Sequence, residues 1–220
     1  MRLPSSFPGV LVAVACGWAL AAAPAPEPRL LEPGTAEHTR LVGLGQPAAD
    51  ALTRRLSEAL LAALAKDGAE AAVVFCRTEA LPLTDATGQA LPGVTGLKRT
   101  SLRVRNPANT PDAAERQALE QVAAQIALGE RPVPLAQRLP SADGEADAVR
   151  LYYPLFIKPA CLTCHGAPDA QPTGLRAALA QGYPDDAALG YRSGEWRGLI
   201  RVSLKTPVAP PAPADGEPGR

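Results

Sequence analysis

Apolar residues in the first half of the chain recur at the spacing of helices. Leucines at positions 52, 56, 60 and 64 form one stripe, which predicts a helix with a single buried face. This helix is expected to begin near Gln46, with Pro47 in its first turn, and to end at Asp67-Gly68. A second helix is predicted from Thr110 to Gly129, because its start carries proline and acidic residues.

In the Thr110–Gly129 helix, Leu119, Val122 and Ile126 are expected to face the core. Residues 69–81 are ambiguous, since Val73-Val74-Phe75 favours a strand and the flanking alanine and glutamate favour a helix.

Strand patterns dominate the second half of the chain. Strands are predicted at Gly96–Val104, Val149–Ile157 and Glu195–Lys205, and Pro154 marks the middle one as an edge strand or a bulge. Helices followed by strands favour a single α+β domain, in which helices flank an antiparallel sheet.

The two ends of the chain differ from this pattern. Residues 1–21 read as a signal peptide, with Arg2 before an apolar stretch and Ala19-Leu20-Ala21 at the cleavage site. The alternative is lipid attachment at Cys16, because the preceding Ala13-Val14-Ala15 resembles a lipobox. Both routes predict a periplasmic protein, and no other stretch is apolar enough to span a membrane. Proline-rich residues 22–36 are expected to be a linker, residues 37–206 the domain, and residues 207–220 a solvated tail.

Charge excludes one class of partner. The 220 residues hold 22 Lys and Arg against 22 Asp and Glu, so the chain lacks the basic character of a nucleic-acid binder.

The segment Cys161-Leu162-Thr163-Cys164-His165 is the attachment motif of c-type haem. Two thiols three positions apart can each bond to one vinyl group, and the next residue, His165, supplies the proximal imidazole. The motif therefore predicts one covalently attached haem c. A zinc site, a thioredoxin-like dithiol and a structural disulfide are the competing interpretations. A zinc ion would need further ligands, a thioredoxin-like dithiol would need a strand before it and a helix after it, and a disulfide would give His165 no role.

The second axial ligand is not methionine, because Met1 is the only methionine and belongs to the signal peptide. The remaining candidates are Cys76, His38, a lysine, water or an open position. Cys76 is the thiol left over when haem uses Cys161 and Cys164. His38, close to the linker, is expected to be solvated.

Arginines supply candidate partners for the haem propionates. Arg99, Arg103 and Arg105 alternate along a predicted strand and could form bidentate contacts with carboxylates. The alternative is that they make up one solvated face of the strand.

Several spaced motifs resemble the c-type haem domains of the DUF3365 (Tll0287-like) family. They are the segment from Lys98 to Asn109 followed by Pro111-Asp112 and Glu115, the haem motif itself, and the later positions Tyr183-Pro184, Asp186, Ala188, Gly190-Tyr191, Gly194 and Arg197-Gly198.

The resemblance implies a PAS-like fold and a helix around Cys76. It also implies that the Cys76 thiolate is the second axial ligand, because Ala72–Arg77 is similar to the family's short apolar run that ends in cysteine. The metal ligands expected on this basis are His165 and Cys76.

These observations favour a non-enzymatic cytochrome that works in electron transfer or redox sensing, with an unidentified redox partner protein. A sensor of NO or CO is the alternative among binding proteins. A peroxidase-like enzyme is disfavoured, since it needs a distal acid–base residue and only His38 would be left for that role.

Overall fold

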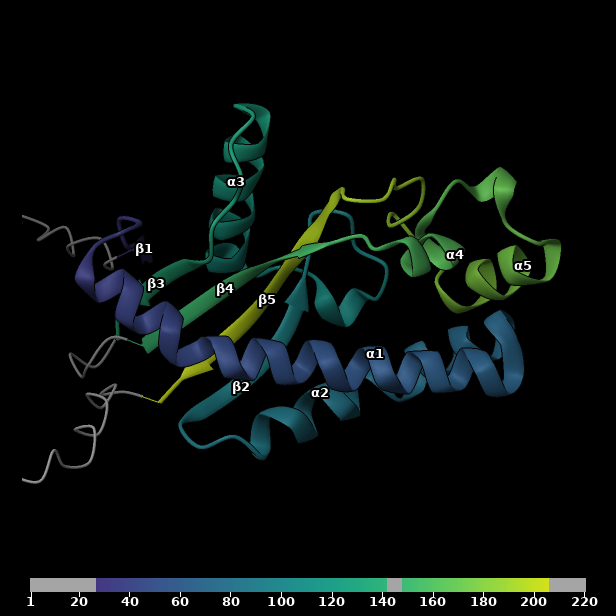
Figure 1. Cartoon of the computed structure of the whole chain (residues 1–220), viewed down its shortest axis with the longest axis horizontal. Helices are drawn as coiled ribbons and strands as arrows, with labels where there is room; N and C mark the ends of the chain where they lie inside the picture. Colours follow the sequence, from purple (N-terminus) through teal and green to yellow (C-terminus); the bar gives the residue numbers. More distant parts are fainter. Residues whose placement is uncertain (1–26, 142–147, 206–220) are drawn as a thin grey trace, which may run out of the picture.

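The computed structural model describes residues 27–141 and 148–205 (Figure 1). The predicted signal peptide at residues 1–21, the lipobox cysteine Cys16 and the predicted tail at residues 207–220 lie outside the described residues. In the described part, no helix combines the length and the apolar character that crossing a bilayer requires.

The described residues contain one antiparallel sheet of five strands in the order β1-β3-β4-β5-β2. The strands are β1 (Arg29–Leu30), β2 (Val94–Thr100), β3 (Leu135–Leu139), β4 (Ala148–Phe156) and β5 (Trp196–Leu204). Helices flank this sheet (Figure 1). The predicted α+β class, with a PAS-like antiparallel sheet in a single domain, is confirmed.

Helices differ more from the prediction than the strands do. The α-helices are α1 (Ala36–Thr78), α2 (Ala80–Gln89), α3 (Ala113–Ala127), α4 (Leu162–His165) and α5 (Thr173–Gly182). Short 3-10 turns lie at Pro107–Asn109, Pro159–Cys161 and Pro168–Ala170.

The long helix α1 begins at its N-cap Thr35, so the predicted start near Gln46 is wrong. Pro47 lies inside the helix, where proline usually costs about 3 kcal/mol. Burial outweighs this cost, because Leu41 and Leu52 are fully buried in a core cluster with side chains of the central strands.

Gly68, the predicted end of the first helix, forms a kink within α1. Its φ of 79° and ψ of −177° are not helical, yet the chain resumes the helix and continues to Thr78. The ambiguous residues 69–81 are therefore helical except for a break at Glu79, and Cys76 lies on the second half of α1.

Helix α3 packs a separate apolar cluster against the sheet. Leu119 and Val122 are fully buried beside Tyr152 and Leu199. Ile126, expected to face the core, is 37% exposed, because α3 reaches beyond the sheet in its last turn.

The buried carboxylate of Glu115 fixes the start of α3 to the sheet. It accepts from Lys98 Nζ at 2.7 Å and from the backbone N–H of Asp112 at 3.0 Å. In turn, the Asp112 side chain accepts a hydrogen bond from the backbone N–H of Glu115, and the two bonds together form a capping box. Lys98 precedes Arg99 on β2, so this contact also fixes the strand that leads into the site.

The strand boundaries show two departures. Strand β2 ends at Thr100 instead of Val104, and β3 was not predicted. Pro154 lies in central strand β4, so it does not mark an edge strand, and the other expectation, a bulge, agrees with the register shift between Leu155 and Phe156. However, β3 pairs with β4 only as far as Tyr152, and a register shift follows Leu155. Locally, Pro154 therefore has a strand neighbour on one side only, which is where proline is tolerated.

Structure begins inside the predicted linker. Strand β1 pairs with β3, and Leu31 is buried. His38 is also buried, with its Nε2 2.9 Å from the carbonyl oxygen of Pro134, so the expectation that it is solvated is wrong.

Gly198 allows the backbone after β2 to approach β5 closely. Its φ is 153°, and a Cβ there would lie 2.2 Å from the carbonyl oxygen of Thr100. We expect Gly198→Ala to lower the free energy of unfolding by about 2–3 kcal/mol, because the clash of the new methyl group with the Thr100 carbonyl adds to the backbone strain.

Gly194→Ala is the matched control, since Gly194 has a φ of 84° and no atom within 4 Å of the added methyl group. This change should cost about 1 kcal/mol from backbone strain alone. Denaturant unfolding of both variants measures the difference, and equal losses would contradict the close contact.

Candidate functional site

Two adjoining cavities lie where α4 and the second half of α1 meet the ends of β4 and β5. Their volumes are about 240 and about 170 Å³. They share walls formed by Cys76, Arg99, Arg105, His165 and Arg197. Four of the predicted site residues therefore face the same space, although they come from α1, β2, the loop after β2 and α4.

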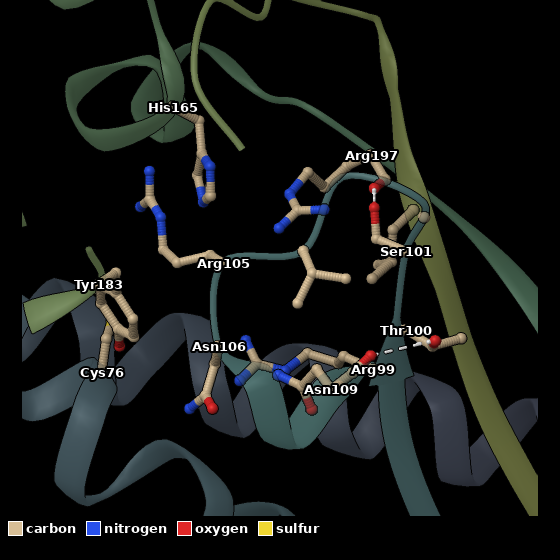
Figure 2. A pocket seen from close by; sticks show the side chains of 13 residues that line it. Cys76, Arg99, Thr100, Ser101, Arg105, Asn106, Asn109, His165, Tyr183 and Arg197 are labelled. Carbon is tan, nitrogen blue, oxygen red and sulfur yellow. Dashed lines mark hydrogen bonds between the residues drawn. The ribbon is translucent and has the colours of Figure 1, made fainter. Parts of the chain in front are cut away.

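The larger cavity continues the apolar stripe of α1. Leu52 is buried in the core, whereas Leu56, Leu60 and Leu64 line the cavity. Cys161 and Cys164 also line this cavity, and not the smaller one. The smaller cavity is bordered instead by polar side chains, including those of Thr100, Ser101, Asn106 and Asn109 (Figure 2). The space thus has an apolar, thiol-bearing end and a polar end.

The two thiols of the motif lie on one tight turn. Cys161 ends a 3-10 turn and Cys164 lies in α4, and all three cysteines of the described part are free thiols. Gly166 ends α4 by donating its N–H to the Leu162 carbonyl. A Cβ at Gly166 would lie 2.6 Å from that oxygen, so the turn requires glycine there.

His165 is held as a neutral imidazole with one nitrogen free. Its Nδ1 lies 2.7 Å from the carbonyl oxygen of Ala188, which can only accept, so Nδ1 carries the proton and Nε2 keeps its lone pair. Burial, together with the positive charges of Arg105 and Arg197, lowers the pKa of His165 to about 3. A neutral imidazole with a free Nε2 is the form that binds a metal.

Cys76 faces the cavities from the second half of α1. Figure 2 places it beside Tyr183, on the other side of the cavity from His165. Burial raises the pKa of the Cys76 thiol, while the positive charges of Arg99 and Arg105 act to lower it. Burial has the larger effect, so the pKa is raised overall, and the arginines reduce the cost of forming the thiolate that ligates a metal.

The arginines that line both cavities, Arg99, Arg105 and Arg197, differ in their partners. Arg105 pairs with the carboxylate of Asp186 at 2.9 Å. Within the described chain, the Arg197 side chain donates only to the carbonyl oxygen of Arg103, at 3.0 Å, and the Arg99 side chain has neither an ion pair nor a hydrogen bond. Burial lowers the pKa values of both Arg99 and Arg197. The cavity thus holds two guanidinium groups without carboxylates, which suits an anionic ligand.

Arg103 and Arg105 do not lie on a strand, because β2 ends at Thr100. Arg103 instead stacks on Tyr191, with its guanidinium carbon 4.0 Å from the ring centre. The expectation that the three arginines share one strand face is therefore wrong.

The sequence pointed to Arg197 and Asp186 only through the family resemblance. Neither lies near the haem motif in sequence, so no local signal could assign their roles.

This arrangement disfavours the zinc interpretation of the motif and His38 as the second axial ligand. Among the described residues, no three His, Cys, Asp or Glu side chains are grouped to hold a metal ion by themselves, as zinc would need. His38 lines neither cavity.

Arg99→Met is expected to raise the free energy of unfolding of the cofactor-free polypeptide by about 1 kcal/mol, because it removes a partly buried charge without a partner. Arg105→Met is the matched control and should lower stability, since it leaves Asp186 buried and unpaired. Denaturant titration of both variants tests the difference. Destabilisation by Arg99→Met as large as that by Arg105→Met would contradict the assignment of Arg99 as unpartnered.

The family match agrees with the resemblance seen in the sequence. The chain is similar to the crystal structure of the cyanobacterial heme-protein Tll0287, with 21% sequence identity and a TM-score of 0.48, over 74% of this chain and 95% of that chain. No curated protein shows significant similarity. The sequence pattern of the Tll0287-like family matches residues 49–205, well over half of the chain. This protein therefore belongs to the Tll0287-like family.

Proposed function

We propose that this protein is an exported monohaem c-type cytochrome that acts in electron transfer or redox sensing. The observation that carries the proposal is the convergence on one cavity of the Cys161–His165 turn and of Cys76. Membership in a family named after a heme-protein supports the same cofactor here.

The side chains around the cavity fit haem c in their chemistry. Cys161 and Cys164 would form the two thioether bonds, and His165 would supply Nε2 as the proximal ligand. Cys76 would supply the second axial ligand from the opposite wall. The apolar leucines of α1 would contact the porphyrin, which suits an apolar cavity with few polar groups.

The charges of the cavity also fit. A ferric haem with ionised propionates and a thiolate ligand carries a net negative charge equal to that of two carboxylates. Arg99 and Arg197, the guanidinium groups without carboxylate partners, would balance that charge. Because Asp186 already neutralises Arg105, we assign the propionates to Arg99 and Arg197 rather than to Arg105.

When bound, the haem iron supplies a one-electron couple whose potential depends on its axial ligands. The Cys76 thiolate would favour the ferric state. His165 is the only imidazole among the residues that line the two cavities, and its proximal role leaves no second imidazole for acid–base chemistry. Electron transfer to or from a partner protein, or redox sensing through one, therefore fits better than catalysis.

We further propose that the protein is periplasmic. The signal-like residues 1–21 support export, and lipid attachment at Cys16 would lead to the same side of the membrane.

Co-expression with a cytochrome c maturation system tests the cofactor. The purified protein is expected to gain the mass of one haem in a bond that survives denaturation. Cys161→Ala together with Cys164→Ala should abolish this gain, whereas Cys76→Ala should retain it. Mass spectrometry and absorbance of the denatured protein measure the result. A colourless wild-type protein at its bare polypeptide mass would refute the proposal.

Cys76→Ala tests the second ligand in the haem-loaded protein. We expect the ferric spectrum to change from low-spin to high-spin and the midpoint potential to become more positive, because a negatively charged donor is lost. Tyr183→Phe is the control, since it alters the neighbour of Cys76 without removing a ligand. Unchanged spectra in Cys76→Ala would contradict the ligand assignment, and a high-spin wild-type spectrum would favour a sensor of small ligands.

A further inference from the structure

Arg105 forms a closed set of contacts beside the proximal histidine, on the wall that the two cavities share. Its Nε donates to Asp186 Oδ2 at 2.9 Å, and its Nη2 donates to the carbonyl oxygens of Cys164 at 2.6 Å and Ala188 at 3.2 Å. Asp186 accepts in turn from the N–H of Ala188 at 2.8 Å. The side chains of Arg105 and Asp186 are 11% and 6% exposed, so this set of contacts is largely shielded from water.

The Ala188 carbonyl oxygen has two donors. One is Arg105, and the other is Nδ1 of His165 at 2.7 Å. A cation that donates to a carbonyl withdraws electron density from its oxygen, which makes that oxygen a weaker acceptor for the imidazole N–H. The strength of this bond in turn sets how much imidazolate character the ring has, and so how strongly Nε2 donates to a metal.

We propose that Arg105 and Asp186 are positioning residues that set the donor strength of His165 through the Ala188 carbonyl. This inference rests on the proposed haem function and extends it. It gives Arg105 a role other than binding a propionate. In this role, Arg105 counteracts the electron-rich thiolate of Cys76 by limiting the donation of the proximal imidazole.

The backbone around Ala188 supports the assignment. The N–H of Gly190 donates to the Gly166 carbonyl at 2.8 Å, and the N–H of Tyr191 donates to the His165 carbonyl at 2.9 Å. These bonds hold the segment after Asp186 alongside the end of α4. Ala188 is itself fully buried, so its carbonyl position is set by packing as well as by these contacts.

Arg103 provides a matched comparison. It comes from the same loop and binds the same segment, but it donates to the carbonyl oxygens of Ala187 and Leu189, on either side of Ala188. A general effect of arginine on the segment would be shared by both residues. An effect through the Ala188 carbonyl belongs to Arg105 alone.

The test compares Arg105→Lys with Arg103→Lys in the haem-loaded protein, since lysine keeps the charge and loses the fork of donors. For Arg105→Lys we expect a more negative midpoint potential and altered low-spin electron paramagnetic resonance g values. The reason is that a stronger bond from His165 to Ala188 makes the imidazole a better donor. Arg103→Lys is expected to match the wild type in both measurements.

Asp186→Asn is the second variant, because it keeps an acceptor for the Ala188 N–H but removes the carboxylate that orients Arg105. It should alter the g values in the same direction as Arg105→Lys. Wild-type g values in either haem-loaded variant, or equal shifts in Arg103→Lys, would overturn the inference. So would failure of both Arg105→Lys and Asp186→Asn to fold while Arg103→Lys folds, since that outcome shows a purely structural role. A wild-type protein without covalent haem would instead refute the proposed function.

Discussion

The imbalance of charge around the cavity is the constraint on which the site depends. Arginines line its walls, and no aspartate or glutamate does so in the part of the chain that the structure describes. Burial, together with the positive charges of Arg105 and Arg197, holds the His165 imidazole neutral, and the charges of Arg99 and Arg105 oppose the effect of burial on the Cys76 thiol. The excess of positive charge thus supports the neutral imidazole, reduces the rise that burial causes in the pKa of the Cys76 thiol, and favours an anionic ligand between the two side chains.

The fold places the arginines of the cavity in different environments, which limits the energetic cost of their excess positive charge. Arg105 has Asp186 as a partner, and the loop that carries it is fixed to the segment after α5. Arg99 and Arg197 instead lie on adjacent strands β2 and β5, where the sheet restricts their backbones. A partly buried cation without a partner is costly in an otherwise apolar region. Such a cost is common at sites whose partner is a ligand, and Arg99 and Arg197 both lie on the wall that the two cavities share.

Local sequence signals predicted the elements whose cause is local. The Cys161–His165 turn, the capped start of α3 and strands β4 and β5 all carry their own patterns of glycine, caps or apolar alternation. Strand β3 does not, because Leu135–Leu139 includes two polar residues that point into contacts made by α3 and α1. The start of α1 was missed for a related reason. Burial of Leu41 stabilises the turns before Pro47, and burial of this kind cannot be seen from the helix alone. His38 likewise is buried and contacts the carbonyl oxygen of Pro134, which is distant in sequence.

The different roles of the arginines follow from where β2 ends. If the strand continued through Arg105, the side chains of Arg99, Arg103 and Arg105 would point to one side of the sheet and could share one ligand. Because β2 stops at Thr100, the following loop turns away and directs Arg103 and Arg105 toward the carbonyl groups between residues 187 and 189. The Ser101 hydroxyl fixes this turn by donating to the Arg197 carbonyl at 2.7 Å and accepting from the N–H of Arg103 at 3.0 Å. Gly198 leaves the space for that approach. The length of one strand therefore decides that Arg99 faces the cavities without a carboxylate partner, whereas Arg105 lines them while also donating to the Ala188 carbonyl that binds His165.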